Sequence, residues 1–209
     1  MSSSALVPSH PVLADRILSR SVATDVALVI GGAALTAGMA QISIPMWPVP
    51  ITGQTLAVLL VGSALGAVRG ASSLALYLVL GLVGLPVYAP QSDGSHLSGL
   101  TAVATPSFGY IIGFVLAAGV VGWLSERSWE RRFFKALATF VGGSLVVFAV
   151  GLPWLSASLH SFGYPSDIDA TLAAGFWPFV VGGIVKAVIA AAILPLAWRG
   201  ADAIAERRR

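Results

Sequence analysis

The residue best placed to do chemistry in this sequence is a lysine inside an apolar segment. Residues 180–194 read VVGGIVKAVIAAAIL, and Lys186 is the one charged position among them. If a helix enters a membrane near Pro178, Lys186 lies about 12 Å deep, and about 18 Å from Trp198 at the other end. The lysine stem does not comfortably reach either interface. A mid-helix lysine is disfavoured by roughly 2.5–3.5 kcal/mol and normally faces a partner or a wet cavity.

A protein carboxylate for this lysine is hard to find. Acidic residues occur only at the ends of the apolar segments, where Asp25 lies near the start of segment 22–42 and Glu126 ends segment 107–126. We therefore predict that Lys186 is a counter-charge or hydrogen-bond donor for a bound ligand in the outer half of the membrane. A water-solvated lysine with a purely structural role is the alternative. Lysine offers a point charge rather than a bidentate grip, which suits a solute that must later be released.

Several other chemistries lack the residues that they require. The sequence has no cysteine, which excludes disulfides, thiol catalysis and thiolate metal sites. It has no Gly-Lys dipeptide and hence no Walker A loop. Ser144 has no visible histidine partner, so we interpret it as a small packing residue. We predict no metal site, because the three histidines, His10, His96 and His160, are far apart and outside the apolar segments. We also predict no cofactor and no enzyme activity.

The composition is that of a membrane protein. Of the 209 residues, 56% are hydrophobic and only 10% are charged, whereas soluble domains carry about 25% charged residues. The mean hydropathy is +0.87. The basic pI does not indicate nucleic-acid binding, because basic residues flank apolar segments instead of following one face.

The elements that would position Lys186 are six apolar segments of a length suited to membrane helices. A turn at residues 66–70 separates the second and third, which are short. We therefore predict an all-α integral membrane protein, with a cytoplasmic N-terminal segment (1–21), a six-helix domain (22–199) and a basic cytoplasmic tail (200–209). The six segments are 22–42, 53–68, 71–88, 107–126, 133–155 and 171–198.

The basic residues predict the orientation of these helices. Six spans put both termini on one side, and that side holds eleven of the twelve Lys and Arg residues. The loops on the other side, near 43–52, 89–106 and 156–170, hold none. The positive-inside rule then makes both termini cytoplasmic, in a multi-pass protein of the cytoplasmic membrane.

The outward loops differ in character from the inner ones. Nine of the twelve prolines lie in or beside them, and three fall within the segment IPMWPVPITGQT at 44–55. Proline restricts its own backbone and that of the preceding residue, so we expect this segment to be a stiff lid or pocket wall and not a simple turn. The later outward loops add polar groups suited to a small solute, namely Tyr88, Gln91, Ser92, Asp93 and Tyr164.

Small residues recur every four positions in the first apolar segment. The pairs are Ala27 with Gly31, Ala33 with Ala37, and Ala34 with Gly38. Such a face allows another helix to approach closely. From spacing alone, ordinary packing within the chain is at least as well supported.

Residues 40–89, which contain the signature PVPITGQT, closely resemble the BioY family of biotin transporters. The similarity continues through FGYIIGF at 108–114 and the lysine-bearing end of the last helix. Members of this family are S components of energy-coupling-factor (ECF) transporters. The resemblance implies a six-helix protein that captures biotin from outside and works with a transmembrane T subunit and two cytosolic ATPases.

The resemblance also assigns roles to particular residues. It places Lys186 in the ligand pocket, opposite the valerate carboxylate or the ureido carbonyl of biotin, and it carries the family's Ala-x-x-x-Ala contact for the T subunit onto Ala33 and Ala37. We further predict that six polar residues bind the ligand alongside Lys186, namely Gln54, Tyr88, Gln91, Ser92, Asp93 and Tyr110.

This sequence departs from the family pattern beside the lysine. Members commonly read Gly-Asp-x-x-Lys, whereas this chain has Gly183 at the aspartate position. The loss leaves a ligand N–H without that acceptor, an effect of about 1–3 kcal/mol, unless Gln54, Gln91 or Asp93 substitutes. Gly53 also replaces the leucine usual in the signature. Three alternatives to biotin capture therefore stay open: uptake of another small carboxylate or vitamin, a membrane-embedded enzyme, and a scaffold subunit.

Overall fold

The computed structural model describes residues 11–91, 93–129 and 132–207, and most of them are helical. The predicted Ser92 lies outside the described residues. A short antiparallel hairpin interrupts the helices, with Ser43 opposite Thr52 and Ile44 opposite Ile51. The elements are α1 (Leu13–Ile17), α2 (Val22–Gln41), β1 (Ser43–Ile44), β2 (Ile51–Thr52), α3 (Gln54–Leu65), α4 (Ala67–Leu82), the 3-10 helix η1 (Gly99–Ala104), α5 (Phe108–Ser125), α6 (Phe133–Ser161), α7 (Ile168–Gly175) and α8 (Trp177–Arg207).

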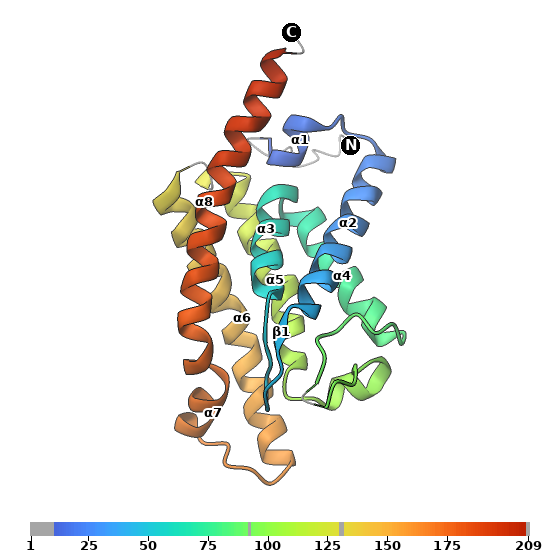
Figure 1. The fold of residues 1–209 in the computed structure, drawn as a ribbon, viewed down its shortest axis with the longest axis vertical. Coiled ribbons are helices and arrows are strands. Elements are labelled where there is room, and N and C mark those ends of the chain that lie inside the picture. Colours follow the sequence, from blue (N-terminus) through green and yellow to red (C-terminus); the bar gives the residue numbers. More distant parts are fainter. Residues whose placement is uncertain (1–10, 92, 130–131, 208–209) are drawn as a thin grey trace, which may run out of the picture.

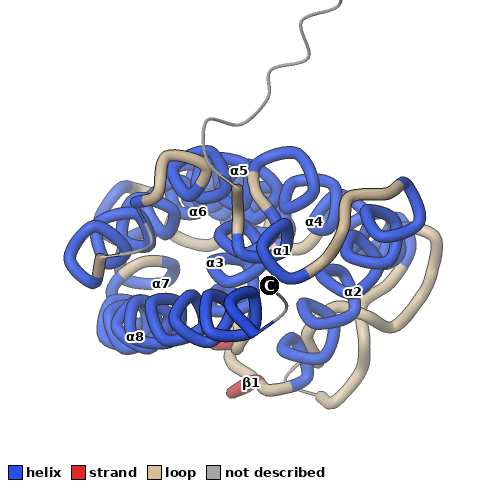
Figure 2. Tube along the Cα trace, turned by 90° about the horizontal axis from the view of Figure 1, so that it is seen from above, coloured by secondary structure: helices blue, strands red, loops and turns tan. Residues whose placement is uncertain are grey.

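The helices form a bundle in which α3 is central. Figure 1 shows the long helices side by side, and the view along the bundle in Figure 2 places α3 inside the ring that the others form. Apolar side chains of α2 to α6 fill one core around α3. A second core joins α3, α5 and α6 to α8. The hairpin and η1 lie toward the end of the bundle opposite α1 (Figure 1).

The protein has four described helices that are long and apolar enough to cross a membrane: α2, α5, α6 and residues 177–203 of α8. The second and third predicted spans form the shorter apolar helices α3 and α4. They are separate helices because Gly66 between them has φ of +86°, in the left-handed region that glycine adopts without strain. The predicted tight turn is therefore present.

Three predicted helix boundaries were wrong. The last segment, 171–198, is not one helix: the chain breaks at Phe176 between α7 and α8, and Pro178 falls in the first turn of α8, where a missing N–H is tolerated. Moreover, α8 continues to Arg207, so the predicted tail at 200–209 begins inside a helix. The third segment, 71–88, ends early at Leu82, because Gly84 has φ of +106°.

The junction of α3 and α4 packs directly against the backbone of α5. A Cβ added at Gly122 would lie 2.3 Å from the Gly66 carbonyl carbon and 2.4 Å from the Ala67 nitrogen. Glu126, one turn further along, accepts the Ala67 N–H at 2.9 Å and so caps the start of α4. Only a residue without a side chain fits at position 122.

We therefore expect Gly122→Ala to destabilise the protein by roughly 1–3 kcal/mol, since backbone atoms must move to admit the methyl group. The melting temperature in detergent should fall by several degrees. Gly119→Ala is the matched control on the same helix, because its Cβ would meet only Ala71 Cβ at 3.7 Å. Equal melting temperatures for the two variants would contradict the close packing of Gly122 against the junction of α3 and α4.

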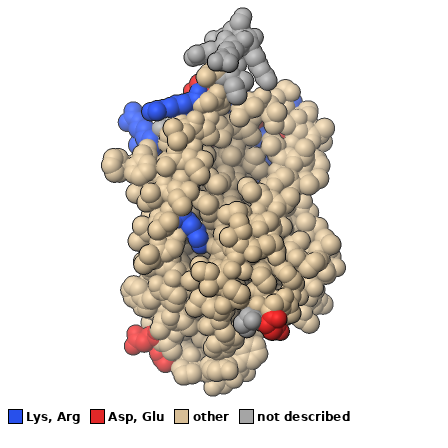
Figure 3. All heavy atoms as spheres, in the orientation of Figure 1, with Lys and Arg blue, Asp and Glu red and all other residues tan. Residues whose placement is uncertain are grey.

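Charge is distributed unequally between the two ends of the bundle. Figure 3 shows most of the visible Lys and Arg side chains at the end that carries the last turns of α8, and acidic side chains without visible Lys or Arg at the opposite end. An ion pair of 2.9 Å between Arg16 and Asp202 joins α1 to α8, so the start and the end of the described chain lie together. This arrangement agrees with an even number of membrane crossings.

Asp15 holds α1 against this end of the bundle. Its side chain is 5% exposed and pairs with both Arg20 and Arg69, and Arg69 also pairs with Asp25. Burial alone raises the pKa of Asp15, but the hydrogen bonds from the two arginines outweigh it, so the pKa lies below its ordinary value of 3.8. The ionised carboxylate is thus the form that the folded protein stabilises.

The stability that Asp15 contributes should be fully present above its unfolded pKa and lost as pH falls through its lower folded pKa. We expect Asp15→Asn to melt at a lower temperature than the wild type at pH 7, and the two curves to converge as pH drops below about 3.8. Thermal unfolding in detergent from pH 7 to pH 3 measures this. A constant difference across that range would contradict the ionic role.

Candidate functional site

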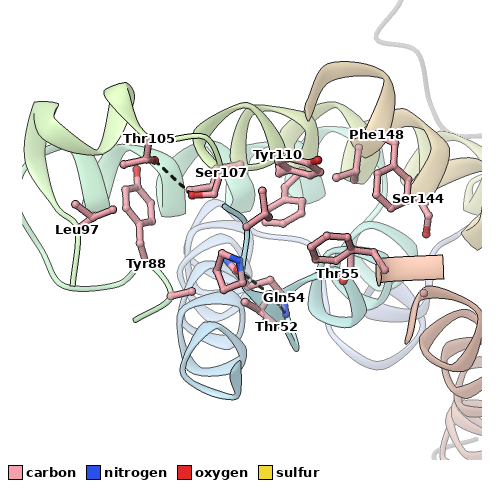
Figure 4. Close-up of a pocket in the computed structure, with 18 of the residues that line it drawn as sticks. Thr52, Gln54, Thr55, Tyr88, Leu97, Thr105, Ser107, Tyr110, Ser144 and Phe148 are labelled. Carbon is pink, nitrogen blue, oxygen red and sulfur yellow. Dashed lines mark hydrogen bonds between the residues drawn. The ribbon is translucent and has the colours of Figure 1, made fainter. Parts of the chain in front are cut away.

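A cavity, partly open to solvent, lies between the hairpin, α3, α5, α6 and α8. Its wall is mostly apolar, with a few polar groups. The side chains labelled in Figure 4 surround one space. The lining residues that the argument uses are Thr52, Gln54, Thr55, Tyr88, Gln91, Tyr110, Ser144, Phe148, Phe179, Gly183 and Lys186.

Lys186 lines this cavity from α8 and is half-buried. Its Nζ donates to the backbone carbonyl of Thr52 at 2.6 Å and to the hydroxyl of Thr55 at 3.1 Å. An ammonium has three N–H donors, so one has no partner among the described residues. No Asp or Glu is among the described residues that line the cavity. The positive charge is therefore oriented by neutral oxygens, with no acidic side chain among the described residues of the wall.

The predicted lid segment, 44–55, is the hairpin and the first turn of α3. It contributes Val49, Pro50, Thr52, Gln54 and Thr55 to the cavity wall. The bond from Lys186 ties the hairpin to α8. At the hairpin tip, the Trp47 ring packs on Tyr164 in the α6–α7 loop, with centroids 4.6 Å apart. The segment thus forms part of the cavity wall, and contacts at Thr52 and at Trp47 hold it in place.

Two tyrosines form opposite parts of the wall, and glycines make room for both. The Tyr88 hydroxyl donates to the Leu78 carbonyl at 2.6 Å, and its ring lies against the bare backbone of Gly81. The Tyr110 hydroxyl donates to the Gly175 carbonyl at 2.9 Å, at the break between α7 and α8. Both rings are buried and both hydroxyls are satisfied, so the tyrosines offer a ligand mainly apolar surface.

The glutamines differ in what they can offer a ligand. Gln54 is 5% exposed, and its amide accepts from Thr52 and donates to Tyr77. Gln91 donates through Nε2 to the Ala89 carbonyl at 3.4 Å, and its Oε1 has no partner among the described residues. Gln91 is thus the better candidate for the acceptor that Gly183 lacks. Gly183 itself lines the cavity, and a Cβ there would meet nothing within 4 Å.

Asp93 does not line the cavity. Its carboxylate is exposed and accepts the backbone N–H and the hydroxyl of Ser95, at 2.9 and 2.6 Å. These bonds close a turn and hold the pKa of Asp93 below its ordinary value. As a substitute acceptor for a ligand, Asp93 is therefore poorly placed.

Sequence reasoning missed several wall residues. Ser107, Phe148 and Phe179 line the cavity, although they carry no charge or motif that would single them out. Thr55 also lines it, and its signal was its place at the end of the signature PVPITGQT. Ser144, interpreted as a packing residue, also lines it, and its hydroxyl donates to the Phe140 carbonyl at 2.9 Å within α6. Serine in a helix commonly makes this bond to the carbonyl four residues earlier.

The pair Ala33 and Ala37 lies on the inner face of α2. Ala33 is 1% exposed in the core around α3, and Ala37 packs against the same core. Ala33 is thus covered in this structure, and the contact carried onto these two alanines stays a prediction. The exposed small residues of the helix are Ala23, Ala27, Gly31, Ala34 and Gly38.

Comparison with known proteins agrees with this architecture. The chain is 37% identical over 154 residues to the biotin transporter BioY of Thermotoga maritima, covering 74% of this chain and 83% of that protein. It is 35% identical over 172 residues to a probable biotin transporter BioY of Pyrococcus horikoshii, covering 82% of this chain and 94% of that one.

Among solved structures, the crystal structure of the S-component for biotin from an ECF-type ABC transporter superposes with a TM-score of 0.66. That match covers 87% of this chain and 95% of the other, at 24% sequence identity, and it shows a shared fold. The sequence model of the BioY family matches residues 10–203, almost the whole described chain. The protein therefore belongs to the BioY family.

Proposed function

We propose that this protein captures biotin at the outer face of the cytoplasmic membrane, as the substrate-specific S component of an ECF transporter. The observation that carries the proposal is the Lys186 ammonium, which lines a mostly apolar cavity and has no acidic partner among the described residues of its wall. In this proposal six helices cross the membrane, α3 and α4 as the two short ones, and both termini are cytoplasmic.

The cavity suits the two ends of biotin differently. The free N–H of Lys186 can serve the valerate carboxylate or the ureido carbonyl, both of which accept hydrogen bonds. Phe148, Phe179 and Tyr110 supply apolar surface for the fused rings. The acceptor for a ureido N–H is Oε1 of Gln91, in the absence of an acid at position 183. The protein performs no covalent step: it binds, desolvates and holds the vitamin.

Energy for transport comes from partners, because the sequence has no Walker A motif. We propose that a T subunit and two cytosolic ATPases supply it, and that the T subunit docks on the exposed small-residue face of α2. This face comprises Ala27, Gly31, Ala34 and Gly38, since Ala33 and Ala37 point inward. A Cβ at Gly31 or Gly38 would meet nothing within 4 Å, so the face is smooth and open.

We expect Ala34→Leu to reduce copurification with the T subunit by about tenfold while leaving biotin affinity unchanged, because the added bulk separates the two helices. Val185→Leu, on an exposed part of α8, is the control and should not affect assembly. Pull-down of the tagged T subunit from co-expressing membranes measures both variants. Normal assembly of the Ala34 variant would place the contact elsewhere.

A second candidate is an S component for another small carboxylate or vitamin. The observation that favours it is the open space beside Gly183, next to the lysine. Equilibrium binding of radiolabelled biotin to the purified protein separates the two candidates. Saturable binding with a Kd below about 1 μM supports biotin. Weaker binding, with retention of another vitamin copurified from membranes, supports the alternative.

A further inference from the structure

A series of hydrogen bonds begins at Lys186 in the cavity wall and ends at Val87, in the loop that follows α4. The Lys186 ammonium donates to the Thr52 carbonyl at 2.6 Å. The Thr52 hydroxyl donates to Gln54 Oε1 at 2.8 Å and accepts the Gln54 backbone N–H at 3.2 Å. Gln54 Nε2 donates to the Tyr77 hydroxyl at 2.7 Å, and that hydroxyl donates to the Val87 carbonyl at 3.2 Å.

Each of the two hydroxyl groups in this series, on Thr52 and Tyr77, donates to one acceptor. Because Thr52 Oγ1 accepts from a backbone N–H, its proton goes to the Gln54 amide oxygen. Because Tyr77 accepts from the Gln54 amide, its proton goes to the Val87 carbonyl. Tyr77 is fully buried and Gln54 nearly so. Removing one member therefore leaves a buried polar group without a partner, which is more damaging than the loss of a surface bond.

Tyr77 lies behind the cavity and is not part of its wall. The loop that it holds, residues 83–98, carries Tyr88 and Gln91 of the wall. The rings of Tyr77 and Tyr88 also meet edge to face, with centroids 5.5 Å apart. Tyr77 makes a shorter bond to the Val87 carbonyl than Gln41, which reaches the Val87 and Tyr88 carbonyls at 3.5 and 3.4 Å. The Tyr88 hydroxyl joins the same loop to the Leu78 carbonyl at 2.6 Å.

We propose that Tyr77 is a positioning residue, which joins the hairpin to the loop of residues 83–98 and so keeps both walls closed on the bound solute. The inference rests on the proposed function in one respect only, namely that biotin is the solute. The hydroxyl of Tyr77 acts through Gln54 on one side and Val87 on the other. Its main effect is on how long the ligand stays bound.

Tyr77→Phe tests this, since it removes the hydroxyl and keeps the ring. In the ligand-free protein, hydrogen exchange of peptides from residues 83–98 should be about tenfold faster than in the wild type. Dissociation of biotin in a chase experiment should be about 3- to 10-fold faster, with a smaller change in the association rate. Ser73→Ala is the matched control: it removes a buried hydroxyl one turn away on α4, which bonds only the Arg69 carbonyl.

A double-mutant cycle separates an effect through the series of hydrogen bonds from a general effect on packing. Thr52→Val breaks the series at the hairpin, so Tyr77→Phe should accelerate dissociation much less in that background than in the wild type. Additive effects, or unchanged exchange in residues 83–98, would overturn the proposal. If the wild type does not bind biotin, the proposed function fails, while the exchange measurement on the ligand-free protein still decides the role of Tyr77.

Discussion

Lys186→Ala is expected to weaken biotin binding by about 10- to 150-fold, the range given by the loss of one hydrogen bond to a charged group. The physical reason is that the ammonium is the only cation among the described residues of the cavity wall, and one of its donors is free for a ligand. Equilibrium binding of labelled biotin to purified variants measures the effect.

Two further variants make this result specific. Lys186→Met keeps the stem without the charge and should lose as much affinity as alanine does. Lys135→Ala removes an equally charged side chain near the Trp129 ring at the other end of the bundle, and should bind like the wild type. If Lys186→Ala bound biotin normally, while Ser144→Ala abolished function, the protein would instead be a membrane-embedded enzyme.

Biotin amide identifies which ligand group meets the lysine. If the carboxylate pairs with Lys186, the wild type should prefer biotin over its amide, and Lys186→Met should lose that preference. If the ureido carbonyl is the acceptor, the variant should bind both compounds more weakly by the same factor. The comparison needs only the same binding assay with unlabelled competitors.

Gly81→Ala is expected to have the second largest effect on binding. A Cβ at this position would lie 2.1 Å from Tyr88 Cζ and within 2.5 Å of two further ring atoms. The ring cannot simply turn aside, because it is 3% exposed and its hydroxyl bonds the Leu78 carbonyl. We expect a loss of roughly 1–3 kcal/mol in stability, and biotin affinity lower by about tenfold or more as Tyr88 leaves the wall.

The control for this substitution is Gly142→Ala on α6, where a Cβ would meet nothing within 4 Å. Alanine has a higher helix propensity than glycine, so the control should be neutral or slightly stabilising. Melting temperature and biotin binding should be measured together on both variants. If Gly81→Ala behaved like the control, the Tyr88 ring would not be fixed in the cavity wall as described.

Patterns along the chain determined the helical class and the position of the charge. Six apolar segments, the turn at Gly66 and the one-sided distribution of Lys and Arg are local or additive properties, so they can be read without contacts. The prediction that Lys186 meets a ligand followed from the cost of an unpaired charge at depth, and the structure places Lys186 in the wall of a cavity. Its partners, Thr52 and Thr55, are more than 130 residues away in sequence.

What only the tertiary structure decided is which faces turn inward. Ala33 and Ala34 are neighbours of the same size, yet the first is in the core and the second is exposed, because the neighbouring helices fix the rotation of α2. Likewise Asp93 and Gln91 were both predicted to contact the ligand, but the loop conformation places only Gln91 in the cavity wall. Composition and periodicity set which residues are compatible with a bundle, whereas long-range packing selects the few that meet around one space.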